Sequence, residues 1–584
     1  MSQTRQIISH LGSWPNWAKF SGITAAGLLL ALGRYDWLAH PGYAVRAWVL
    51  SGYFFLLLLA GATLAAQALG LAGRGRFWPL LTSAALVLNL PYRWLGLGSW
   101  FYLENHAGGY GFEKTFAPEW LLHGNPRIPW NGTDALLLGL LGLAALGWWL
   151  ARRGTLARRD ADLLWGLSGR GFFCLLLGFM TAEMWLHLSN RSPYTYISHY
   201  EQPEANHYVY AYNLLPDGRG AVNADAGYFL ELEDLFQGHG AGPHMLLVRR
   251  PFSFYLSSHL SYFIGGYHAF LILNLLFWFA AAAAMFHFAR DLTGSAAVAV
   301  SAAGFVACGP GFIMYAAQPM AYLPGFAILA LAVFLYHRLL QADRFASVAT
   351  VTAAGILIGI TFLTYDNFAW ALFFLGYPLL MRASVLRAGA SVLIGAAIYV
   401  GYLLLVFHIF SLPPADHQND QYMGEAARHT LDLLRHPASA KIRVMLGSYF
   451  GNYWSQVLQV NFYVPALLAV LGFCFTRSGF LIRAIALLLF LPSAAAFGVL
   501  YFGESFLASY SRFNYASYPA VVLLAALAIG RTAEYFAHRH HPRSAACLLA
   551  LPFLACAVLA NIDAFGLMQR LYFHFYFSTG GTFS

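Results

Sequence analysis

The sequence contains few charged residues. Asp, Glu, Lys and Arg together make up 10% of the 584 residues, whereas soluble domains carry about 25%. Hydrophobic residues make up 59% of the chain, and so many apolar runs need lipid around them. The shortage of charge therefore excludes a soluble protein and predicts a polytopic integral membrane protein.

Cysteine is also scarce, and all five cysteines lie inside apolar segments. No pair falls in an expected outer loop, so neither a disulfide nor a metal cluster is predicted. His239, His244, His259 and His268 do not have the spacing of a strong zinc pattern. We therefore expect no metal and no cofactor.

Two further signals are absent. The first apolar run has no small-residue cleavage site after it, so no cleavable signal peptide is expected. The net charge of +9 comes from basic residues dispersed between apolar runs. Such dispersal is typical of membrane topology signals and argues against a nucleic-acid partner.

What the chain does contain is a long series of apolar segments. A membrane-spanning helix needs about 20 mostly apolar residues, and by that criterion about fifteen spans are expected, or fourteen if the short first segment is not one. The expected spans are 18–33, 47–71, 77–97, 133–150, 171–188, 264–288, 295–314, 320–337, 346–363, 367–381, 388–410, 459–475, 484–502, 517–533 and 545–562.

The charges between these spans predict the orientation. With the N-terminus in the cytoplasm, more than half of the 34 basic residues and few of the 25 acidic ones fall in cytoplasmic segments. This asymmetry follows the positive-inside rule. Two long polar segments, 189–263 and 411–458, are then outside. Channels and transporters usually keep their chemistry near the bilayer midplane, so the function is expected at the outer surface.

The first long outer loop contains a candidate general base. Phe229, Leu232 and Phe236 recur at helical spacing and predict a short amphipathic helix at the membrane interface over 226–237. Asp225 stands at the start of this helix, where amide donors favour the ionised carboxylate. That carboxylate is either a proton acceptor for an attacking hydroxyl or simply a helix cap.

The same loop ends in two arginines. Arg249 and Arg250 precede Pro251 and a stretch that includes Tyr255 and leads into the next span. Adjacent arginines at the outer rim are suited to binding a phosphate, with Tyr255 as a further candidate contact. The alternative is that they extend toward lipid headgroups.

These features together resemble the GT-C superfamily of polytopic membrane glycosyltransferases, and in motif the aminoarabinose and protein O-mannosyl transferase group. The resemblance rests on Asp-x-x-Tyr at Asp225 and Tyr228, the amphipathic helix, a Gly-rich turn, and Arg250-Pro251 before a span. Ala226 stands where that group has a second acid, and arginine stands where it has lysine. Because of these departures, Glu201 and Glu204 remain alternative bases.

The resemblance implies an architecture and a donor. The implied fold is all-α, with a seven-helix core and two long extracytoplasmic loops that bear short amphipathic helices. It divides the chain into an accessory module at 1–160, a core at 161–458 and a variable module at 459–584. Outside the cytoplasm there is no nucleotide sugar, so the implied partner is a polyprenyl-phosphate-linked sugar, with a glycan, lipid or protein as acceptor.

Four other residues are candidates for the same site. Asp366 lies in a tight outward turn, where it either serves function or caps the turn. Lys441 and Arg443, in the second long loop, either line an anionic site or form a solvated face. Arg512 precedes the span at 517–533 and resembles an Arg-Tyr-x-x-Pro feature of the superfamily, which implies a phosphate contact.

The expected activity is an inverting glycosyl transfer at the outer face of a bacterial-type cytoplasmic membrane. Two alternatives stay open. A polysaccharide ligase or polymerase would use a polyprenyl-diphosphate donor. A transporter or lipid flippase should show inverted repeats and midplane charges, which the sequence does not show.

Overall fold

The computed structural model describes part of the chain. The described residues are 15–35, 37–38, 41–73, 76–90, 102–103, 114–115, 139–146, 149, 170–189, 236, 250–264, 266–309, 312–313, 316, 321–410, 435–436, 464–475, 479–501, 517–539, 544, 548–554 and 556.

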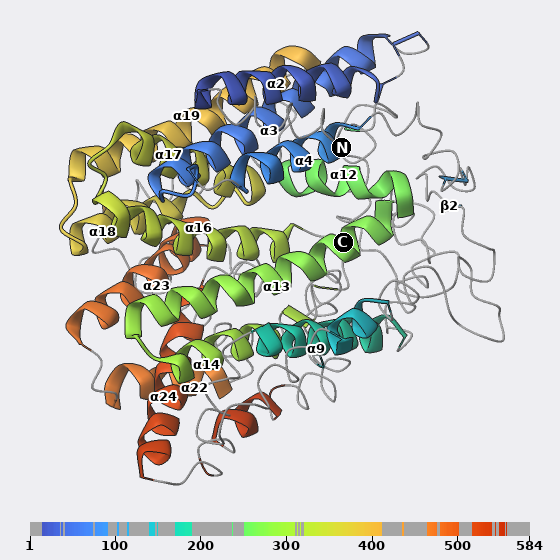
Figure 1. Cartoon of the computed structure of the whole chain (residues 1–584). Coiled ribbons are helices and arrows are strands. Elements are labelled where there is room, and N and C mark those ends of the chain that lie inside the picture. The colour runs from blue at the N-terminus through green and yellow to red at the C-terminus, as the bar shows by residue number, and fades with distance from the viewer. Residues whose placement is uncertain are drawn as a thin grey trace, which may run out of the picture.

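The described part is built almost entirely of helices, which confirms the helical fold class (Figure 1). A two-residue antiparallel strand pair, β1 (Tyr102–Leu103) with β2 (Lys114–Thr115), was not predicted. The helices are α2 (Asn16–Leu32), α3 (Pro41–Ala68), α4 (Phe77–Asn89), α9 (Arg170–Ser189), α12 (Phe252–Ile264), α13 (Gly266–Thr293), α14 (Ala296–Ala307), α16 (Tyr322–Asp343), α17 (Val348–Thr364), η4 (Phe368–Trp370), α18 (Ala371–Leu380), α19 (Val385–Phe410), α22 (Val464–Phe475), α23 (Phe480–Tyr501) and α24 (Tyr518–His538).

Five of the described helices are long and apolar enough to cross a membrane. They lie in α3, α13, α16, α19 and α24, and shorter apolar helices accompany them. Every one of these helices overlaps a span expected from the sequence. The length and composition of these helices therefore support the prediction of a membrane-embedded helical protein.

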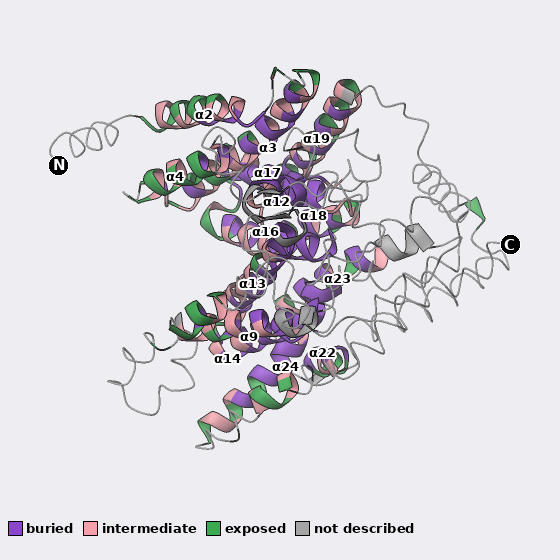
Figure 2. Cartoon of the chain, turned by 90° about the vertical axis from the view of Figure 1, so that its right-hand side faces the viewer, coloured by how far each residue is buried: buried purple, intermediate pink, exposed green. Residues whose placement is uncertain are grey.

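Much of the buried core follows a row of helix contacts, in which α14 packs against α13, α13 against α16 and α16 against α17 (Figure 2). Helix α14 has no polar face, and nearly all of its side chains are buried. By contrast, α2 and α4 keep large apolar side chains such as Leu29 and Leu80 exposed. An all-round apolar helix in the interior and apolar side chains on the outside are the pattern of a bundle in lipid.

Glycines allow a close helix contact between α17 and α19. A Cβ added at Gly395 would lie 2.6 Å from Ile358 Cγ2, and one at Gly359 would lie 2.8 Å from Ile398 Cγ2. Gly355 stands one turn before Gly359 and meets Ile394 in the same way. Small residues at four-residue spacing let helix backbones approach closely, which drives helix association in membranes.

Helix α3 packs against α17 and, less extensively, against α16 and α19. Its Phe54 belongs to the main core and touches Tyr402 of α19 with ring centroids 5.4 Å apart. The first long helix is thus part of the same packed bundle as the expected core helices.

The bundle has two polar ends, which we name by their arginines. At the Arg338 end, Arg338 of α16 forms an ion pair with Asp291 of α13, with Nε and Oδ2 2.7 Å apart. At the Arg250 end, Arg250 lies over the ring of Tyr365, which follows α17. Tyr322, the first residue of α16, lies beside Tyr365, with ring centroids 6.0 Å apart. Consecutive helices therefore alternate in direction between the two ends, as expected for successive spans.

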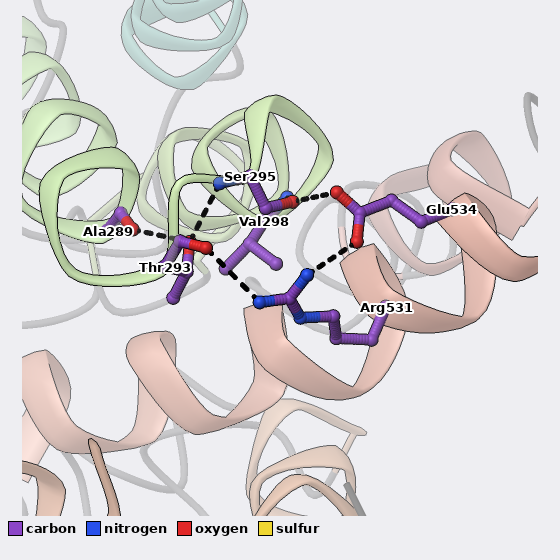
Figure 3. Close-up of polar contacts among 6 residues, drawn as sticks. All are labelled: Ala289, Thr293, Ser295, Val298, Arg531 and Glu534. Carbon is purple, nitrogen blue, oxygen red and sulfur yellow. Dashed lines mark hydrogen bonds and ion pairs between the residues drawn. The ribbon is translucent and has the colours of Figure 1, made fainter. Parts of the chain in front are cut away.

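A second network stabilises the Arg338 end (Figure 3). Arg531 of α24 donates to Glu534 Oε2 at 2.8 Å and to the Thr293 carbonyl oxygen at 3.2 Å. The Ser295 hydroxyl donates to Glu534 and accepts from the Val298 amide, so it also caps α14. The network fastens the last long helix to the α13–α14 turn.

One helix was not predicted. The sequence 252–263 was treated as the end of an outer loop, whereas the structure contains a separate helix, α12, packed between α3, α13 and α17. Phe252, Phe254, Ser257 and Ser258 are all buried, so this short helix has no solvent-facing stripe. Without such a stripe, periodicity gives no signal for a helix.

Candidate functional site

Arg250 lies two residues before α12, with Pro251 between them. Proline disfavours the helical conformation of the residue before it, so Pro251 keeps Arg250 outside the helix. The helix itself begins normally, because the Tyr255 amide donates to the Pro251 carbonyl oxygen at 2.9 Å. Arg250 is therefore fixed at the start of a rigid, buried helix.

The partner of Arg250 is Asp366, in the turn after α17. Arg250 Nε donates to Asp366 Oδ1 at 2.6 Å. The side chains are 21% and 15% exposed, so the pair is largely shielded from solvent. The cap of the turn is a different residue, since the Asn367 side chain accepts from the Ala369 amide at 3.2 Å. The carboxylate of Asp366 is thus used to hold the arginine.

Aromatic rings complete the surroundings of the guanidinium. Arg250 Cζ lies 4.5 Å from the centroid of the Tyr365 ring, a cation–π contact. Burial by itself would lower the pKa of Arg250, but Asp366, Tyr365 and Tyr322 outweigh it and raise that pKa above its ordinary value. The guanidinium is therefore a permanent positive charge.

This arrangement leaves part of the guanidinium available. Asp366 engages Nε, and neither Nη of Arg250 forms a hydrogen bond or ion pair with another described residue. Two parallel N–H donors on one side of a planar group match a carboxylate or a phosphate. The site is therefore an oriented cation suited to binding an oxyanion.

A second polar group lies further along α12. His259 Nδ1 is 2.7 Å from the Tyr255 carbonyl oxygen, which can only accept, so Nδ1 carries the proton. The other ring nitrogen, Nε2, then accepts from Arg34 Nη1 at 3.0 Å. Arg34 follows α2 and also donates to the Leu88 carbonyl oxygen at the end of α4, at 3.4 Å. This contact joins the N-terminal helices to α12.

The imidazole of His259 is neutral. Burial, and then the positive charge of Arg34, hold its pKa well below the usual range. A neutral imidazole with Nδ1 protonated offers Arg34 a lone pair without adding a second positive charge. Nothing in the sequence distinguishes Arg34 from an ordinary charged residue after an apolar helix.

Tyr255, a predicted contact residue, is fully buried. Its ring packs against those of Phe54 of α3 and Phe236, with centroid distances of 5.1 and 5.5 Å. Phe236 is one of the apolar residues of the helix expected over 226–237, and it is the residue of that segment that the structure describes. It is helical and fully buried.

Tyr518 begins α24, shortly after Arg512 in the chain. Its ring lies 4.6 Å from that of Phe312 and 5.7 Å from that of Phe326, between centroids. Phe326 stands one turn after Tyr322 on α16. The start of α24 is therefore packed close to the Arg250 end.

Of the predicted site residues, the structure describes Arg250, Asp366 and Tyr255, and it brings Arg250 and Asp366 into contact. The convergence of Arg249, Arg250 and Arg512 stays a prediction. The predicted residues that lie outside the described residues are Glu201, Glu204, Asp225, Tyr228, Arg249, Lys441, Arg443 and Arg512.

Within the described residues, no three His, Cys, Asp or Glu side chains gather as a metal site would require. No protein-family model, curated protein or solved structure is significantly similar to the chain. The chemistry of Arg250 and its neighbours is thus the structural basis for a functional interpretation.

Proposed function

We propose that the protein is an inverting glycosyltransferase of GT-C type. In this proposal it moves a sugar from a polyprenyl-phosphate-linked donor to a glycan, lipid or protein acceptor at the extracytoplasmic face of the membrane. The bilayer supplies the donor, whose lipid tail lies between helices and whose phosphate lies at the Arg250 end.

The observation that carries the proposal is the orientation of Arg250. Asp366 and Tyr365 hold the guanidinium, and both Nη groups remain without a partner among the described residues. An arginine that only extended toward lipid headgroups would not need a carboxylate to hold it, such as that of Asp366 in the turn after α17. The phosphate group of a bound lipid-linked donor accounts for both the anchoring and the free donors.

The proposed reaction needs one base and one phosphate site. Asp225 takes the proton of the acceptor hydroxyl, whose oxygen attacks the anomeric carbon. The new glycosidic bond forms as the bond between that carbon and the phosphate oxygen breaks, and the polyprenyl phosphate leaves. Negative charge grows on the leaving phosphate, so Arg250 binds the transition state more tightly than the ground state.

The proposal includes a topology. About fifteen spans, a cytoplasmic N-terminus and a bacterial-type inner membrane would put the Arg250 end outside. The short basic turns at Arg344 and Arg382 would then be cytoplasmic. The separation of the two polar ends in the bundle is consistent with this orientation.

Binding of the shared lipid portion of the donor tests the proposal. Purified full-length protein should bind polyprenyl monophosphate, and Arg250→Gln should weaken that binding by roughly 10- to 100-fold, since a hydrogen bond to a charged group contributes about 1.5–3 kcal/mol. Arg290→Gln, which removes a charge at the opposite end, should leave it unchanged. Equal binding by wild type and Arg250→Gln would refute the assignment, and a clear preference for the diphosphate would favour a ligase or polymerase.

A further inference from the structure

Two turns at the Arg338 end have an unusual backbone. Among the described residues, the non-glycine residues with positive φ are Arg344 (52°), Phe345 (63°) and Arg382 (56°). Arg344 and Phe345 form the α16–α17 turn, and Arg382 lies in the α18–α19 turn. All of the left-handed non-glycine residues that the structure describes are therefore confined to two turns.

The α16–α17 turn contacts the first turn of α19, the helix that directly follows the α18–α19 turn. Arg387 Nη1, from the first turn of α19, donates to the Phe345 carbonyl oxygen at 2.7 Å and also to the Ala346 carbonyl oxygen. Phe345 is fully buried and meets Tyr336 edge-on, with ring centroids 5.2 Å apart. The α16–α17 turn is thus anchored on both sides and forms a rigid unit with the start of α19.

Arginine is an unexpected residue at these positions. The left-handed conformation after a helix is usually taken by glycine, which has no Cβ to clash with the backbone. A strained non-glycine residue that the fold tolerates tends to mark a functional site. Arg344 and Arg382 are both exposed, and neither side chain forms a hydrogen bond or ion pair with another described residue. Among the described residues, neither arginine side chain makes a contact that would offset the strain of its backbone.

A large, exposed apolar side chain follows each arginine four residues later in the sequence. Val348 is 82% exposed and Leu386 is 86% exposed, on the first turns of α17 and α19. From these positions both helices continue as apolar segments. Cations at a helix end with exposed aliphatic residues next to them are typical of the boundary between lipid headgroups and acyl chains.

We propose that these two turns form a binding site for an anionic phospholipid, with Arg344 and Arg382 on the phosphate and with Val348 and Leu386 against the acyl chains. The acyl contact distinguishes this ligand from a free phosphate. The site is at the opposite end of the bundle from Arg250 and does not depend on the proposed transferase activity.

The left-handed backbone allows a clean test. Arg344→Gly and Arg382→Gly together remove both charges while supplying the residue that the conformation favours. Full-length protein in detergent is titrated with phosphatidylglycerol or phosphatidylcholine and analysed by native mass spectrometry. Wild type should prefer phosphatidylglycerol, and the double variant should bind it about tenfold or more weakly, since each charge-assisted contact contributes that order of affinity. Its thermal stability in detergent alone should equal or exceed that of wild type.

Arg290→Gln is the matched control, because it removes an exposed charge at the same end but outside the two turns. It should keep the preference for phosphatidylglycerol. The proposal is overturned if wild type shows no preference, if the double variant retains it, or if Arg290→Gln loses as much. Displacement of the lipid by inorganic phosphate at millimolar concentration would contradict a lipid site.

Discussion

Arg250 Nε donates a 2.6 Å hydrogen bond to Asp366 Oδ1, and so ties the start of α12 to the end of α17. The residues are far apart in the sequence and belong to segments that looked independent. From the sequence alone, the function of either residue was ambiguous. Their contact shows that Asp366 orients the guanidinium of Arg250. An arginine fixed at Nε can present both Nη groups to an oxyanion without paying the entropy of ordering a long side chain.

Removal of the anchor should therefore affect both stability and binding. Asp366→Ala leaves Arg250 shielded without its carboxylate and should lower the free energy of unfolding by about 1.5–3 kcal/mol. Affinity for polyprenyl phosphate should fall as well, because the guanidinium is no longer oriented. Asn367→Ala, which removes only the cap of η4, should leave that affinity unchanged. If both variants behave alike, Asp366 is part of the turn and does not position Arg250.

The contact between Arg34 and His259 predicts a pH effect. His259→Phe removes the acceptor of a buried guanidinium and should cost about 1.5–3 kcal/mol of stability. In the wild type, the folded pKa of His259 lies well below its unfolded value of about 6.5. The unfolded state therefore binds the extra proton, and stability falls as the pH drops below about 6.5. Thermal unfolding between pH 7 and pH 5 should show a smaller loss for His259→Phe than for the wild type.

The glycine contact between α17 and α19 predicts a position-specific effect within one helix. Gly395→Leu should destabilise the protein by about 1–3 kcal/mol or prevent its folding, since the new side chain meets Ile358 and the Gly355 carbonyl oxygen. Gly401→Leu, on the same helix, enters open space and should be tolerated. Equal tolerance of both substitutions in a detergent thermal-stability assay would show that α17 and α19 do not pack in this way.

Cysteine labelling tests the orientation. In a cysteine-free background, Ser384→Cys at the Arg338 end should be protected from an impermeant thiol reagent in intact cells. Leu38→Cys, in the exposed turn between α2 and α3, should react. Both should react once the membrane is permeabilised. The reversed pattern in intact cells would put the Arg250 end in the cytoplasm, where nucleotide sugars are available, and would remove the reason for a lipid-linked donor.

The sequence predicted the helical fold well because apolar length is a strong signal. The spans expected at 320–337 and 346–363 correspond to α16 and α17, with boundaries that differ by up to six residues. Helix α12 was missed because it is buried all round and short, so neither length nor periodicity distinguishes it. The two-residue strand pair gave no signal of its own.

The sequence predicted individual residues of the candidate site, but it did not predict which of them lie together. Arg250 could simply have extended toward lipid headgroups, and Asp366 could simply have capped its turn. Only the packing of α12 against α17 shows that the two residues belong to one site. Tyr322 and Tyr365 were not recognised as neighbours of Arg250, because an aromatic residue at a helix end has many ordinary roles. Arg34 and His259 lie on segments that no sequence rule joins.

The central claim is the transfer of a sugar from a polyprenyl monophosphate, with Asp225 as the base. The most direct measurement is lipid mass spectrometry of proteoliposomes supplied with a panel of polyprenyl-phosphate sugars and envelope acceptors. Wild type should convert at least one donor to free polyprenyl phosphate. Asp225→Asn keeps a capping oxygen, so it should fold, yet turnover should fall by roughly 100- to 10,000-fold. Glu201→Gln should remain active. No conversion by wild type, release of a diphosphate, or an active Asp225→Asn beside an inactive Glu201→Gln would contradict the account.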